Sequence, residues 1–122
     1  MSDTKFTPGP WTVENGFNVF GPLGGESGDG IICDDNEGWQ VADVGSYLTA
    51  VDGDLVQLGW GVSRANVTLI AAAPELYEAL QGTVRILDAL LSEGFTGYVE
   101  DSRKVKAALA KARGEQKQEK SQ

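Results

Sequence analysis

The spacing of apolar residues changes along this chain, from alternation in the first half to a helical period in the second half. In the first half, short alternating runs are separated by segments rich in glycine, which is typical of strands joined by turns. The pair Asn15-Gly16 lies between two such runs and predicts a β-hairpin. We expect strands at residues 11–13, 17–20, 31–33, 39–44 and 47–51.

Residues 52–61 leave two interpretations open. Val56, Leu58 and Trp60 alternate with polar residues or glycine, which suits a strand. Two glycines weaken a strand, so the segment is equally compatible with a mobile loop that exposes Trp60.

The second half predicts helices. Ser63 is expected to cap a helix over residues 64–73, and Pro74 either kinks that helix or opens a second one. A leucine-rich stripe then continues to Gly94, which is a typical helix stop. A last helix, capped by Asp101 or Ser102, is expected to end at Gly114.

These elements predict an α+β fold, with a small N-terminal antiparallel β-sheet followed by two or three C-terminal helices, one of them kinked at Pro74. Residues 1–114 are expected to form a single domain, and residues 115–122 a disordered polar tail.

The residue inventory excludes much catalytic chemistry. The chain has no histidine and one cysteine, Cys33, which excludes a His-based triad, a His-ligated metal, a zinc cluster and an intramolecular disulfide. The acidic turn at residues 34–37 lacks the spacing of an EF-hand. We therefore expect no enzyme, no metal and no cofactor. The single thiol and the short apolar runs favour a protein of the reducing cytoplasm that does not enter a membrane.

Charge is unevenly distributed. The net charge is −8, but residues 1–100 hold fifteen acids and three bases, whereas residues 101–122 hold three acids and seven bases. An acidic body repels the phosphate backbone, so general nucleic-acid binding is not expected. The basic segment is compatible with a solvated helix end, with an acidic partner, or with folding back onto the acidic part.

Two arginines, Arg64 and Arg85, stand in a stretch that holds no other base. Arginine is suited to bidentate binding of a carboxylate or phosphate. The alternative is that each arginine pairs with a neighbouring acid and has no further role.

Two segments carry a resemblance to a known family. Residues 7–11 read Thr-Pro-Gly-Pro-Trp, and residues 65–80 read Ala-Asn-Val-Thr-Leu-Ile-Ala-Ala-Ala-Pro-Glu-Leu-Tyr-Glu-Ala-Leu. This combination resembles a family of small phage and prophage proteins, with Val67 and Tyr77 as departures from its pattern. The resemblance implies a phage protein that acts in the host cytoplasm.

The order of elements resembles, more loosely, the phage anti-defence proteins that sequester the cyclic ADP-ribose signal of Thoeris systems. Those proteins are non-enzymatic sponges with an N-terminal antiparallel sheet and C-terminal helices, and they bind the nucleotide at subunit interfaces. The resemblance implies a homodimer or higher homo-oligomer that binds a nucleotide second messenger.

A ligand site of this kind needs an aromatic face for the base and donors for the phosphates. Trp60 is the expected stacking residue, with Phe17 or Phe20 as substitutes. The free N–H groups of the helix that begins near Ser63 are expected to bind phosphate. Arg64 and Asn66 lie beside that helix start, and Arg85 is expected to close the site, from the same or a second subunit. Trp60 in a core, Ser63 as a cap and Asn66 as a local hydrogen-bonding residue are the structural alternatives.

Three functions stay open at this point. The first is a sponge for a nucleotide immune signal. The second is an acidic, anti-CRISPR-like protein-binding inhibitor of a host defence complex. The third is a structural accessory dimer formed through the stripe from Leu76 to Leu91.

Overall fold

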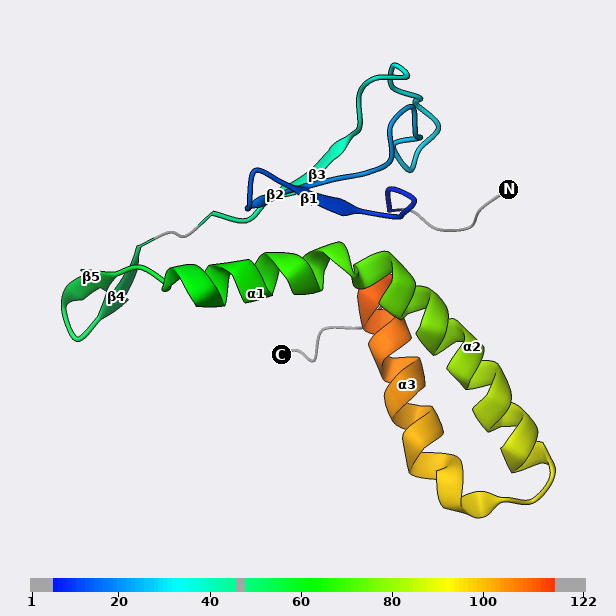
Figure 1. Cartoon of the computed structure of the whole chain (residues 1–122). Helices are drawn as coiled ribbons and strands as arrows, with labels where there is room; N and C mark the ends of the chain where they lie inside the picture. The colour runs from blue at the N-terminus through cyan, green and yellow to red at the C-terminus, as the bar shows by residue number, and fades with distance from the viewer. Residues whose placement is uncertain (1–5, 46–47, 116–122) are drawn as a thin grey trace. The chain divides into compact units, whose positions relative to one another are not determined.

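The computed structural model describes residues 6–45 and 48–115 of the chain (Figure 1). The chain forms two compact units, Met1–Pro74 and Glu75–Gln122. Within the described residues, five short strands precede three α-helices, so the predicted α+β class is confirmed.

Strands β1 (Thr12–Glu14), β2 (Asn18–Phe20) and β3 (Gln40–Asp43) form an antiparallel sheet in the order β1-β2-β3. Asn15 and Gly16 both have positive φ, 55° and 82°, and lie in the turn of residues 15–17 between the paired residues Glu14 and Asn18. Thr12 pairs with Phe20 and Glu14 with Asn18, so the predicted hairpin is confirmed.

The segment between β2 and β3 is a loop closed at its neck, where Gly21 N–H donates to the Trp39 carbonyl at 2.8 Å. The strand predicted at residues 31–33 is wrong, because only an isolated bridge between Glu26 and Ile32 forms there. Gly30 has a φ of 100°, which interrupts the extended backbone, and Cys33 N–H donates within the loop to the Gly25 carbonyl at 3.1 Å.

A second hairpin resolves part of the ambiguity at residues 52–61. Strands β4 (Thr49–Val51) and β5 (Asp54–Val56) pair around Asp52 and Gly53, which have φ values of 51° and 86°. The strand expected at residues 47–51 is therefore present from Thr49, and Tyr47 lies outside the described residues.

Helix α1 (Trp60–Ala71) begins one turn earlier than predicted. Gly59 has the extended conformation of an N-cap, and Ser63 N–H donates to its carbonyl at 3.0 Å, so the predicted Ser63 cap is wrong. Ser63 is 2% exposed and Val67 is 0% exposed. These two residues are four apart, so they share one face of α1, and α1 contacts β1 and β2 of the sheet. Burial of that face in tertiary packing favours the longer helix.

Helix α2 (Ala73–Ser92) follows after a break at Ala72, with Pro74 as its second residue. Pro74 is buried, and a methyl group on Gly9 would lie 2.7 Å from Cβ of Pro74. Gly9 precedes a cis peptide bond to Pro10. The two sequence segments that carry the phage resemblance therefore approach each other at Gly9 and Pro74.

The last helix, α3 (Val99–Ala112), continues directly from the short 3₁₀ helix η1 (Thr96–Tyr98). The predicted cap at Asp101 or Ser102 is wrong, because both lie in the first turn and Ser102 is 4% exposed. The 3₁₀ turn supplies the helix start instead.

Glycine stops end α2 and α3 as predicted. Gly94 and Gly114 have φ values of 95° and 76°, and the next residues, Phe95 and Glu115, donate N–H bonds back to the carbonyls of Leu90 and Ala110. Glu115 is the last described residue, and residues 116–122 of the predicted tail lie outside the described residues.

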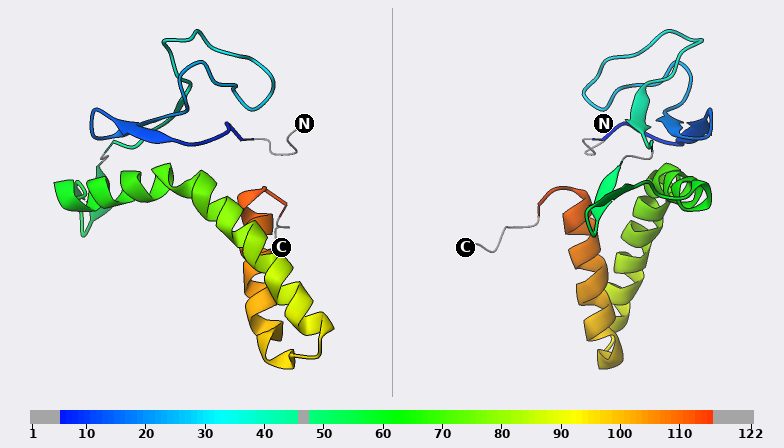
Figure 2. Two further views of the ribbon diagram at one scale, coloured as in Figure 1. Left: turned by 45° about the vertical axis from the view of Figure 1, so that its right-hand side comes forward. Right: turned by 90° about the vertical axis from the view of Figure 1, so that its left-hand side faces the viewer.

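Helices α2 and α3 run side by side (Figure 2). Lys106 Nζ lies 3.1 Å from Asp88 Oδ1, and Arg113 Nη1 donates to the Tyr77 hydroxyl at 3.3 Å. Leu87 is 8% exposed and Leu109 is 5% exposed, so both are buried, whereas Leu76 is 48% exposed. Part of the leucine stripe is therefore buried within the chain itself. No helix among the described residues combines the length and apolarity needed to cross a membrane.

Candidate ligand-binding site

Trp60 is the first residue of α1, and its side chain is 64% exposed. The ring meets the Phe17 ring edge-to-face, with centroids 4.8 Å apart and planes at 87°. Gly16, in the β1–β2 turn, approaches the far edge of the same indole. The hairpin turn therefore orients Trp60 while most of the indole surface stays open.

Arg64 lies one helical turn after Trp60, and its guanidinium carbon is 5.7 Å from the centroid of the Trp60 ring. This distance is within the range of a cation–π interaction. Within the described part of the first unit, Arg64 is the one basic side chain. The sequence-predicted residues Phe17, Trp60 and Arg64 thus form one cluster, called here the Trp60 cluster.

The start of α1 adds backbone donors to the Trp60 cluster. The first N–H groups of a helix have no acceptor within the helix, which here concerns residues 60–62. The Ser63 N–H is already bonded to Gly59. The expected phosphate-binding end of the helix is therefore at Trp60 rather than at Ser63.

Asn66 does not join this cluster. It follows Arg64 by two residues, or about 200° around the helix axis, so the two side chains leave α1 in nearly opposite directions. Asn66 is exposed on the other flank of the helix.

Arg85 belongs to the second unit, where it lines a hollow of about 280 Å³ between α2 and α3. Lys106 and Arg113 line the same hollow, together with Gln81, Val84 and Leu109. The hydrogen bond to the Tyr77 hydroxyl, followed by the bond to Glu115, raises the pKa of Arg113. We call this group of three basic residues the Arg85 hollow.

Lys106 and Arg113 were not among the predicted site residues. Their seven-residue spacing places them on one face of a helix, and the charge excess after residue 100 was the available signal. Which bases of α3 face Arg85 depends on the register of α3 against α2, and sequence spacing alone does not define that register.

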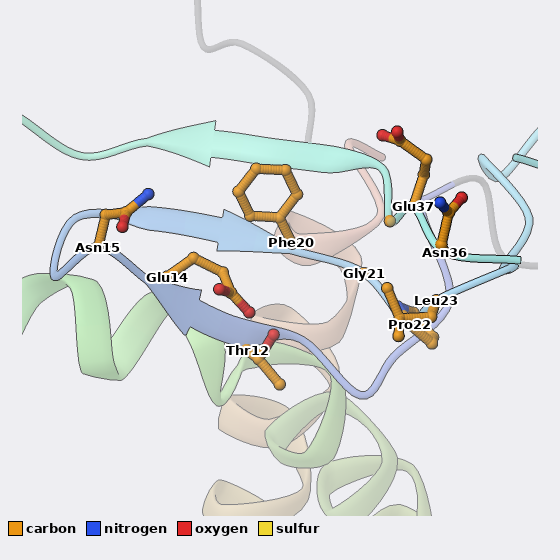
Figure 3. A pocket seen from close by; sticks show the side chains of 10 residues that line it. Thr12, Glu14, Asn15, Phe20, Gly21, Pro22, Leu23, Asn36 and Glu37 are labelled. Carbon is orange, nitrogen blue, oxygen red and sulfur yellow. The ribbon is translucent and has the colours of Figure 1, made fainter. Parts of the chain in front are cut away.

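The first unit holds another hollow, of about 540 Å³, against the sheet (Figure 3). Thr12, Glu14 and Phe20 line it from the strands, and Asn36 and Glu37 line it from the loop. This hollow is lined by two carboxylates and by no basic side chain. It therefore favours binding of a cationic or neutral group and disfavours binding of a phosphate.

The other acidic and aromatic motifs have local roles. The indole N–H of Trp11 donates to the Thr7 carbonyl at 2.9 Å, and that of Trp39 donates to the Ile31 carbonyl at 3.1 Å. The acidic turn at residues 34–37 joins no group of three or more metal-ligating side chains in residues 6–45 and 48–115.

Comparison with known proteins shows the family of the chain. No curated protein and no solved structure matches it. Residues 1–116 match the family described as Salmonella phage P22 protein Y8K6. This match supports the prediction of a phage protein family. The two motifs as its signature and the looser likeness to the cyclic ADP-ribose sponges stay predictions. Because the match spans nearly the whole chain, the protein belongs to the family of the Salmonella phage P22 protein Y8K6.

Proposed function

We propose that this phage protein binds and sequesters a nucleotide immune signal of the cyclic ADP-ribose type, without catalysis, in the host cytoplasm. The observation that carries the proposal is the Trp60 cluster, in which an exposed indole is oriented by Phe17 and flanked by the cation of Arg64.

Each part of the cluster matches one part of a nucleotide. A base stacked on an aromatic side chain contributes about 1–3 kcal/mol. Micromolar binding needs about 8 kcal/mol, so stacking alone is insufficient. Arg64 and the N–H groups at the start of α1 supply the charged and dipolar contacts that a phosphate requires.

The same groups favour binding over turnover. A phenyl ring, an indole, a guanidinium and backbone amides donate hydrogen bonds or stack, and none of them is a general base near neutral pH. The thiol of Cys33 is not part of the Trp60 cluster. It lies in the β2–β3 loop, with Sγ 3.0 Å from the Glu37 carbonyl oxygen. We also propose a homodimer or higher oligomer, in which a second subunit completes the site.

Calorimetry with a panel of nucleotides, including cyclic ADP-ribose isomers, tests this function. We expect saturable binding that Trp60→Ala and Arg64→Ala each weaken by about tenfold or more. Arg103→Ala is the matched control, because Arg103 is an exposed arginine paired with Glu100 on α3. The absence of binding by every nucleotide in the panel would count against the proposal, as would equal losses in all three variants.

The distribution of acidic residues favours a second candidate, an inhibitor that binds a basic surface of a host defence complex. Residues 1–74 hold ten acids and two bases, and Glu14 and Glu37 line the larger hollow. Such an acidic surface favours fast, salt-dependent association with a cationic partner. A pull-down with defence complexes tests this candidate. It is favoured if Glu14→Gln and Glu37→Gln each reduce capture of the complex and if added salt abolishes capture. Capture that is insensitive to salt would contradict it.

A further inference from the structure

We propose that the Arg85 hollow is a separate binding site for the phosphate group of a small organic phosphate. Three basic side chains from two helices line one cavity there, and the proposal does not depend on the function proposed for the Trp60 cluster.

The three bases retain hydrogen-bond donors for an anion. Among the residues that the structure describes, Arg85 has no ion pair, so all five of its N–H donors are available. Arg113 uses Nε for Glu115 and Nη1 for Tyr77, which leaves three N–H donors. Lys106 donates towards Asp88 and keeps two donors. A phosphate has several acceptor oxygens and suits such convergent donors.

The competing carboxylates are partly open to water. Asp88 and Glu115 have side chains 48% and 57% exposed, and exposed ion pairs of this kind contribute little to stability. An anion in the hollow can therefore replace either carboxylate at small cost. With three bases against two acids, the cluster keeps a net positive charge.

The charge of the surrounding unit also permits an anion here. Residues 75–122 hold eight acids and eight bases, whereas residues 1–74 carry all of the net negative charge. Residues 75–115, the described part of this unit, hold seven acids and six bases, so the charge of this unit opposes an anion at Arg85 only weakly.

The size and lining of the hollow narrow the class of ligand. Its volume of about 280 Å³ is just below the roughly 300–1,000 Å³ of drug-sized ligand pockets, so it suits a small phosphomonoester. Val84 and Leu109 provide apolar contact for an organic group beside the phosphate.

Titrations of the full chain with phenyl phosphate and with inorganic phosphate, followed by amide chemical shifts, test the site. We expect saturable shifts at residues 81–85 and 106–113, with phenyl phosphate binding more tightly than inorganic phosphate. Arg85→Gln is expected to weaken phenyl phosphate binding by about tenfold. Lys104→Ala and Lys111→Ala are matched controls, since both bases lie on α3 about 160° from Lys106 or Arg113 around the helix axis.

The outcomes separate this site from the Trp60 cluster. Trp60→Ala is expected to leave the phenyl phosphate shifts at residues 81–85 and 106–113 unchanged, and Arg85→Gln is expected to leave the melting temperature within a few degrees of the parent. The proposal is overturned if neither phosphate gives saturable shifts, if Lys104→Ala or Lys111→Ala reduces binding as much as Arg85→Gln, or if inorganic phosphate binds more tightly than phenyl phosphate.

Discussion

Trp60 shows how single residues prepare the candidate site. A free indole samples several rotamers, but the edge-to-face contact with Phe17 and the nearby Gly16 restrict this one. The ring is thus oriented before any ligand arrives, which lowers the entropy cost of binding.

Phe17, Trp60 and Arg64 could be named from the sequence because an aromatic face and a guanidinium suit a nucleotide. Their arrangement could not, because Trp60 was expected in a strand or loop before the helix, whereas it is the first residue of α1 and shares a helix face with Arg64. The expected role of Asn66 disagreed with the helix that the sequence itself predicted. Asn66 follows Arg64 by two residues, so it lies on the opposite flank of the helix wherever that helix begins.

Gly9 gives a residue-level prediction. A Cβ at this position would lie 2.7 Å from Cβ of Pro74. The proline ring at Pro74 has little freedom to move away from it. We expect Gly9→Ala to lower the free energy of unfolding by about 1–3 kcal/mol, through overpacking. Urea denaturation measures the change.

Gly61→Ala is the control for that substitution. Gly61 lies in α1 with no atom within 4 Å of an added Cβ, so alanine there is expected to be neutral or slightly stabilising. Equal destabilisation by both substitutions would show that the contact between Gly9 and Pro74 is not the cause.

At the scale of elements, turns and helix stops were predicted well and helix starts were not. The turn at Asn15 and Gly16 and the stops at Gly94 and Gly114 depend on positive φ, which asparagine and glycine adopt readily, whereas the turn at Asp52 and Gly53 lies in the segment that the sequence left open. The starts of α1 and α3 use Gly59 and a 3₁₀ turn, without a side-chain cap hydrogen bond. Ser63 and Ser102 have the composition of caps, but both are buried inside their helices.

The first turn of α3 gives a prediction about pH. The Arg103 guanidinium hydrogen-bonds to Glu100 and lowers the pKa of that carboxyl below its ordinary value. Because the folded-state pKa is depressed, the stabilising contact is present at neutral pH and is lost as the pH falls through the folded-state pKa. NMR titration should give Glu100 a pKa below that of an unpaired glutamate, and Arg103→Ala should restore the ordinary value. An unchanged Glu100 pKa in that variant would contradict the assignment.

At the scale of the whole molecule, charge is divided between the two units. The excess of acids lies in residues 1–74, and the second unit is balanced. The charge asymmetry could be read from the sequence, and so could the sheet-then-helices order. The Arg85 hollow could not, because it requires Lys106 and Arg113 of α3 to face Arg85 of α2. That register comes from the packing of two helices.

The family match shows a phage protein family, and the binding function that we propose depends on the Trp60 cluster. Equilibrium dialysis against cyclic ADP-ribose isomers, followed by chromatography of the ligand released on denaturing the protein, tests this claim most directly. The account predicts that one isomer is retained at a fixed ratio to protein and is released chemically unchanged. Retention of none of the isomers, or release of a hydrolysed product, would contradict it.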